Sequence, residues 1–216
     1  MLSCQQIAWP VVEHANESAE LTNTRLISEA TWDIPLLDAQ MQAREMVAPI
    51  TKWGHIGRGK EMPGTYHFYT DDYKFSALWN KPAQPLASGC TQVVEANYST
   101  NPEMPRAVAL WRTYQKRYLA RFWQLHGLRV LVDLNVEPEF ADINLLGVPQ
   151  GWRAYATRWL DQYGEFPVLE QYRLAQERAG SNDVLFVVFG GRDLAERTCA
   201  RNGWTWIREH SGIVNG

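Results

Sequence analysis

Short runs of apolar, β-branched and aromatic residues recur along the chain from residue 65 onward, and each run has the length and composition of a strand. The runs are Thr65–Thr70, Gln92–Asn97, Arg129–Asn135, Trp152–Thr157, Val184–Phe189 and Trp204–Ile207. The run Val184–Phe189 (VLFVVF) is apolar at every position, which is typical of a central parallel strand covered on both faces.

Helical patterns fill most of the intervals between these runs. The clearest is Pro105–His126, which has proline in its first turn and Gly127 as its stop. Its apolar positions at helical spacing are Val108, Trp111, Tyr118, Phe122 and Leu125, so we expect Trp111 in the core. Further helices are expected at Asp72–Asn80, Val168–Ala179 and Asp193–Asn202.

Strands that alternate with helices indicate an α/β fold with a mainly parallel sheet of about six strands, built from repeated βα units. The pattern leaves open whether the sheet is doubly wound and open or closed like a barrel. The first part of the chain differs, because residues 13–30 are polar and Pro35 and Pro49 interrupt short apolar pieces. We therefore expect an irregular N-terminal arm, residues 1–60, packed on an α/β domain, residues 61–216.

Composition adds few constraints. The chain has 216 residues and a net charge of −3, so it has no global basic field for nucleic acid. No stretch of about 18 apolar residues and no signal peptide is visible, so we expect a cytoplasmic protein without a membrane partner. Cys4, Cys90 and Cys199 lack zinc-site spacing and are expected to be reduced thiols. Ten tryptophans favour a bulky core over a stacking platform for bases or sugars.

Polar residues gather where the first three expected strands end. Because the carboxyl ends of parallel strands share one edge of the sheet, these side chains are candidates for one cleft. The expected catalytic group is Glu95, Asp133, His67 and Asn97. Oxygen ligands for Mg²⁺ or Mn²⁺ could come from Asp71, Asp72 and Asn135.

Structural roles compete with each of these assignments. Asp71 or Asp72 could cap the following helix, and His67 could be a hydrogen-bonded core residue. Glu95 and Asp133 lie in apolar strands, where an unpaired carboxylate is costly. They therefore need an open cleft, a cation or a basic partner, and pairing with arginines would make a metal unnecessary.

Two further features could bind anions. Gly190 and Gly191, followed by Arg192, precede an expected helix and could cradle a phosphate, although a tight turn explains the glycines as well. The helix Pro105–His126 carries a basic face, which would be either solvated or in contact with nucleic acid or a host protein. That face consists of Arg112, Lys116, Arg117 and Arg121.

Several ordered segments resemble one known family. They are GTYHFYTDDYKFSALW (Gly64–Trp79), VVEANYST, EMPRAVALW, the stretch ending in ARFWQLHG, and LLGVPQGWRAYAT. Together they resemble the phage and mobile-element proteins classed as domain of unknown function 4417, over roughly residues 30–210. The resemblance implies a phage, plasmid or bacterial origin and assigns no activity. It also implies Asp in relatives where this chain has Asn97, which places a catalytic role for Asn97 in doubt.

Two functions remain open from the sequence. The first is an enzyme with a carboxylate and histidine cleft that acts on a small or phosphate-bearing substrate, with a divalent metal as a possible cofactor. The second is a non-enzymatic accessory protein that binds nucleic acid or a host protein through the basic helix face. Motifs for covalent catalysis, such as GxSxG or HExxH, are absent from the sequence.

Overall fold

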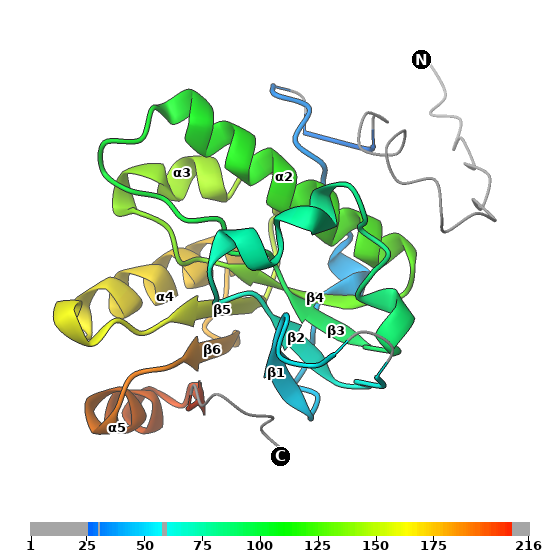
Figure 1. Cartoon of the computed structure of the whole chain (residues 1–216). Coiled ribbons are helices and arrows are strands. Elements are labelled where there is room, and N and C mark those ends of the chain that lie inside the picture. Colours follow the sequence, from blue (N-terminus) through cyan, green and yellow to red (C-terminus); the bar gives the residue numbers. More distant parts are fainter. Residues whose placement is uncertain (1–25, 30, 58–59, 209–216) are drawn as a thin grey trace.

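The strands and helices surround one core, seen in a computed structural model that describes residues 26–29, 31–57 and 60–208 (Figure 1). The first part of the expected N-terminal arm, with Cys4, lies outside the described residues. Cys90 and Cys199 are buried free thiols. No described helix combines the length and the apolar character that a membrane span requires.

All six expected strand runs form strands, and one unexpected strand precedes them. The strands are β1 (Ile50–Lys52), β2 (Thr65–His67), β3 (Gln92–Val94), β4 (Arg129–Asp133), β5 (Ala154–Arg158), β6 (Leu185–Phe189) and β7 (Thr205–Ile207). Every neighbouring pair is parallel, and the spatial order follows the chain from β1 to β7. The α/β prediction is therefore confirmed.

The sheet curls into a half-barrel, which settles the alternative that the sequence left open. In a flat sheet β2 and β6 would lie about 19 Å apart, because four strand spacings separate them. The ring centroids of His67 on β2 and Phe189 on β6 are only 4.6 Å apart. These two side chains therefore meet across the concave interior of the curl.

Helices cover the outside of the curl (Figure 1). They are α2 (Arg106–Leu125), α3 (Ala141–Asn144), α4 (Phe166–Ala179) and α5 (Asp193–Asn202). The side chain of Tyr172 on α4 packs edge-on against Phe186 of β6, with ring centroids 5.1 Å apart. The expected helix Asp72–Asn80 is instead two short 3-10 helices, η2 (Asp72–Lys74) and η3 (Ser76–Trp79).

The side chains of α2 that are buried differ from those that the sequence predicts. Trp111 is 47% exposed, so its expected burial is wrong, whereas Lys116 and Arg117 are buried. The reason is that α2 is covered on several sides. On one side of α2 lies the segment before β1, where the backbone N–H of Asp38 donates to Gln124 Oε1 at 2.8 Å. On another side Arg117 Nε donates to the Leu146 carbonyl at 2.9 Å.

Gly191 is required by close packing at the start of α5. Its backbone has φ +75°, and a Cβ there would lie 2.5 Å from Ala195 Cβ and 2.6 Å from Trp159 Cδ1. Gly190 is engaged as well, since its N–H donates to the Ile207 carbonyl at 2.9 Å. The glycine pair therefore serves a tight turn and the packing of Trp159.

We predict that Gly191→Ala lowers the free energy of unfolding by about 2–5 kcal/mol, because left-handed strain and overpacking add together. The matched control is Gly203→Ala, which has φ +71° and nothing within 4 Å of the added Cβ. Strain alone should cost the control about 1–2 kcal/mol. Denaturant unfolding of both variants measures the difference, and equal losses would contradict the packing role of Gly191.

Candidate functional site

The two carboxylates singled out in the sequence meet at the carboxyl ends of β3 and β4. Glu95 directly follows β3, and Asp133 is the last residue of β4. The backbone N–H of Asp133 donates to Glu95 Oε2 at 3.1 Å. Both side chains are 0% exposed, so neither faces an open cleft.

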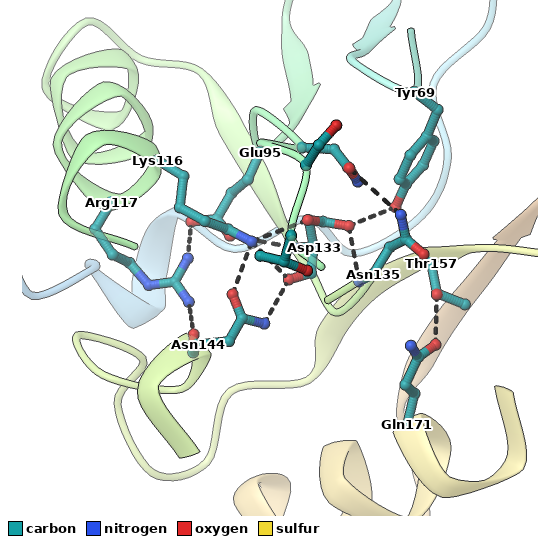
Figure 2. A network of polar contacts seen from close by, with 12 residues as sticks. Tyr69, Glu95, Lys116, Arg117, Asp133, Asn135, Asn144, Thr157 and Gln171 are labelled. Atoms are coloured by element: carbon teal, nitrogen blue, oxygen red, sulfur yellow. Dashed lines mark hydrogen bonds and ion pairs between the residues drawn. The ribbon is translucent and has the colours of Figure 1, made fainter. Parts of the chain in front are cut away.

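Two basic residues of α2 compensate these buried charges. Lys116 Nζ lies 2.9 Å from Asp133 Oδ2 and also donates to the Asp133 carbonyl at 3.2 Å. The guanidinium of Arg117 pairs with Glu95 Oε1. Figure 2 shows both side chains reaching from the helix toward the strand ends. Two residues expected on a basic outer face thus form the buried counter-charge of the site.

Asn144 and Tyr69 complete the network. Asn144 Oδ1 accepts from Lys116 Nζ at 2.7 Å, and Asn144 Nδ2 donates to the Asp133 carbonyl at 2.9 Å. The Asn144 carbonyl accepts from Arg117. Tyr69 donates its hydroxyl to Asp133 Oδ1 at 3.0 Å (Figure 2). These contacts give every carboxylate oxygen and both cations a partner within the described residues.

Burial sets the protonation of this network. It raises the pKa of Asp133, and the charge of Lys116 opposes that shift. Burial and the neighbouring Asp133 carboxylate raise the pKa of Tyr69 well above its ordinary value of 10.0. The phenol therefore keeps its proton at neutral pH and remains a hydrogen-bond donor.

The residues considered for a metal have other partners. Asp71 is exposed and pairs with Lys74 at 3.0 Å, and Asp72 accepts from the N–H and hydroxyl of Ser99. Asn135 Nδ2 donates to Asn97 Oδ1 at 3.3 Å. Within the described part of the chain, no three His, Cys, Asp or Glu side chains gather closely enough to hold a metal ion.

His67 lies beside the network on the concave face of the sheet. It is the last residue of β2, Tyr69 follows two residues later, and the two ring centroids are 5.7 Å apart. The side chain is 5% exposed, and its Nδ1 has no hydrogen-bond partner among the described residues. Burial, with Lys52 and Arg158 nearby, lowers the pKa of His67 from 6.5 to about 3. The imidazole is therefore neutral at physiological pH.

Lys52 and Arg158 border His67, and sequence reasoning missed both. Lys52 is the register partner of His67 on β1, and Arg158 is the register partner of Phe189, whose ring contacts His67. Both cations are half-buried. Arg158 ends β5, so the strand-end rule could have found it. Lys52 could not be found this way, because β1 was not expected.

Asn97 contributes a second unpartnered donor near the strand ends. It is buried, its Oδ1 accepts from Asn135, and its Nδ2 has no partner among the described residues. Tyr69 was also missed, although it alternates with His67 in the run Thr65–Thr70 and thus shares its face. Asn144, in the short α3, had no sequence signal.

The remaining anion-binding candidates are placed differently from the expectation. Arg192 is exposed and lies 3.7 Å from Asp161. Arg121 is largely buried and lies 3.7 Å from Asp38. The guanidinium of Arg112 lies over the Tyr98 ring, 5.1 Å from its centroid. Of the four residues of the expected basic face, Lys116 and Arg117 are therefore buried, whereas Arg112 and Arg121 remain partly exposed.

Parallel strands in chain order, helices outside the curl and a charged network at the strand ends define an α/β protein of the repeated strand–helix class. The chain belongs to the family described as Domain of unknown function (DUF4417), which it matches over residues 27–163. The family resemblance drawn from the sequence segments is thereby confirmed.

Two phage proteins are similar to the chain. The "Gene 1 protein" of Mycobacterium phage D29 is 32% identical over 91 residues, which cover 41% of this chain and 34% of the relative. The "Gene 1 protein" of Mycobacterium phage L5 is 33% identical over 92 residues, 41% of this chain and 40% of the relative. The matched segments thus span well under half of these relatives' lengths. No solved structure matches the chain.

We predict that Asp133→Asn lowers the free energy of unfolding by about 3–5 kcal/mol, because it leaves Lys116 as an uncompensated buried cation. The matched control is Asp142→Asn, which breaks the exposed Arg106–Asp142 pair and should cost less than about 1 kcal/mol. Denaturant unfolding measures both. A melting temperature that rises with Mg²⁺ or Mn²⁺ in the wild type, but not in Asp133→Asn, would contradict the closed network.

A second prediction concerns acid sensitivity. Between about pH 3 and pH 6.5 the unfolded chain protonates His67 whereas the folded chain does not, so stability falls as the pH falls through this range. His67→Gln should remove about 1.4 kcal/mol per pH unit from the slope of unfolding free energy between about pH 6 and pH 4. The control, His55→Gln, deletes an exposed imidazole. An equal change of slope in both variants would argue against the buried neutral state.

Proposed function

We propose that the protein is an enzyme that binds a small anionic substrate, carrying a phosphate or carboxylate group, at the carboxyl ends of β1, β2 and β5. The observation that carries this proposal is the neutral, buried His67, whose Nδ1 has no hydrogen-bond partner among the described residues and whose ring is influenced by two half-buried cations, Lys52 and Arg158. Polar groups buried without partners are rare in folded proteins, and they are often completed by a ligand or by ordered water.

The charges around His67 favour an anion. Lys52 and Arg158 both lower the pKa of the imidazole, so the potential at that ring is positive. Glu95 and Asp133, by contrast, are each paired with a cation of α2. An anionic substrate group between Lys52 and Arg158 would be attracted to this potential and would gain charge-assisted hydrogen bonds.

Each residue then has a distinct task. Lys52 and Arg158 hold the anionic group, and His67, neutral at physiological pH, donates a hydrogen bond to a developing oxyanion. Tyr69 is a positioning residue, because its hydroxyl is fixed on Asp133 and its ring lies beside the imidazole. Asn97 Nδ2 offers an additional donor at the same edge of the sheet.

The location agrees with the general behaviour of this architecture. In barrels of parallel strands, active sites lie at the carboxyl ends of the strands, where several loops can contribute side chains. The half-barrel presents His67, Tyr69 and Arg158 at this end of its concave face. A resident divalent metal is not part of the proposal, since the two carboxylates already have cationic partners. Relatives from phages suggest a bacterial cytoplasm as the setting.

The test is a thermal-shift screen of sugar phosphates, nucleotides and dicarboxylates on the purified chain. At least one compound should raise the melting temperature of the wild type, and Lys52→Gln and Arg158→Gln should each weaken its binding about tenfold or more. Turnover of that compound, followed by NMR, should fall at least about a hundredfold in His67→Gln while binding is kept.

The matched control is Arg173→Gln, which removes an exposed arginine of α4 and should change neither binding nor turnover. The enzyme proposal is wrong if no anionic compound stabilises the wild type. It is also wrong if a compound binds but His67→Gln turns it over at the wild-type rate.

A further inference from the structure

A second polar region lies at the opposite, amino-terminal end of the sheet. A surface hollow of ≈ 590 Å³ opens there, beside the first residues of β4 and β6 and the residue before β5. The lining side chains come from residues 39–44, together with Arg129, Arg153, Asp183 and Leu185. This volume is typical of small-molecule sites, which range from about 300 to 1,000 Å³.

The wall of the hollow is held in place by the sheet. Gln42 forms a parallel bridge with Val130, and the N–H of Ala43 donates to the Val130 carbonyl at 2.9 Å. Arg129 Nη1 donates to the carbonyls of Gln40 and Gln42 at 3.3 and 3.1 Å. The segment is thus fixed before any ligand arrives, which lowers the entropy cost of binding.

The charges of the hollow are unequal. Three arginines line it, Arg44, Arg129 and Arg153, against one carboxylate, Asp183. Asp183 lies 3.0 Å from Arg153 and is 88% exposed at its side chain, so it neutralises one guanidinium. Among the described residues, no ion pair joins Arg44 or Arg129 to a carboxylate, which leaves a net positive hollow.

We propose that this hollow binds a small phosphate-bearing molecule, at a site separate from the one around His67. Guanidinium groups present paired donors that match the oxygens of a phosphate. Arg44 and Arg153 are exposed and supply the donors, and Arg129 adds positive charge while it holds the backbone of residues 40–42. The side-chain amide of Gln42 lies in the same wall, and its Oε1 accepts from the N–H of Arg153 at 2.6 Å.

The experiment titrates the full chain with inorganic pyrophosphate by calorimetry at constant ionic strength. We expect saturable binding that weakens at least about fivefold in Arg44→Gln and in Arg153→Gln. Asp183→Asn removes the one negative charge and should tighten binding about two- to fivefold. This opposite sign distinguishes the hollow from damage to the fold, and melting temperatures of the variants confirm that each is folded.

A control separates the outcomes. Arg173→Gln on α4 removes an exposed charge elsewhere and should leave the affinity unchanged. The proposal is overturned if pyrophosphate gives no saturable heat at millimolar concentration. It is equally overturned if Arg173→Gln weakens binding as much as Arg44→Gln, or if Asp183→Asn does not tighten it.

Discussion

The rest of the structure depends on how four buried charges are compensated between α2 and the ends of β3 and β4. Each ion removed from water costs several kcal/mol, so Glu95 and Asp133 can be buried only with Arg117 and Lys116 beside them. The partners lie on consecutive positions of one helix. We infer that this requirement fixes the rotation and height of α2 on the sheet more strictly than apolar packing would.

That constraint explains why α2 turns charged side chains toward the sheet and an apolar side chain toward solvent. The residues that point toward the sheet include two long cations, and part of the apolar surface is turned elsewhere, where Trp111 stacks on Tyr114 with ring centroids 5.6 Å apart. It also explains the place of Tyr69, because Asp133 still accepts a hydrogen bond after Lys116 is paired. The network therefore links the helix on the outside of the curl to His67 on the inside.

Sequence reasoning found what depends on local pattern and missed what depends on distant partners. The strand runs were recognisable because β-branched and aromatic residues cluster in them, whereas β1 has only three residues and directly follows Pro49. Glu95 and Asp133 were singled out correctly as costly positions. Basic partners were one expected means of compensation, but the sequence does not identify them. Helical spacing predicts a solvated face for Arg117, and nothing local shows that Asn144 and Leu146 cover it.

The two ends of the sheet use positive charge in different ways. At the carboxyl end, two cations are buried and paired with carboxylates, and Lys52 and Arg158 are half-buried near His67. At the amino end, the arginines stay near solvent, where their charge is screened by salt. A ligand at the carboxyl end would therefore be held by few but strong contacts in a low-dielectric interior, and one at the amino end by weaker contacts that respond to ionic strength.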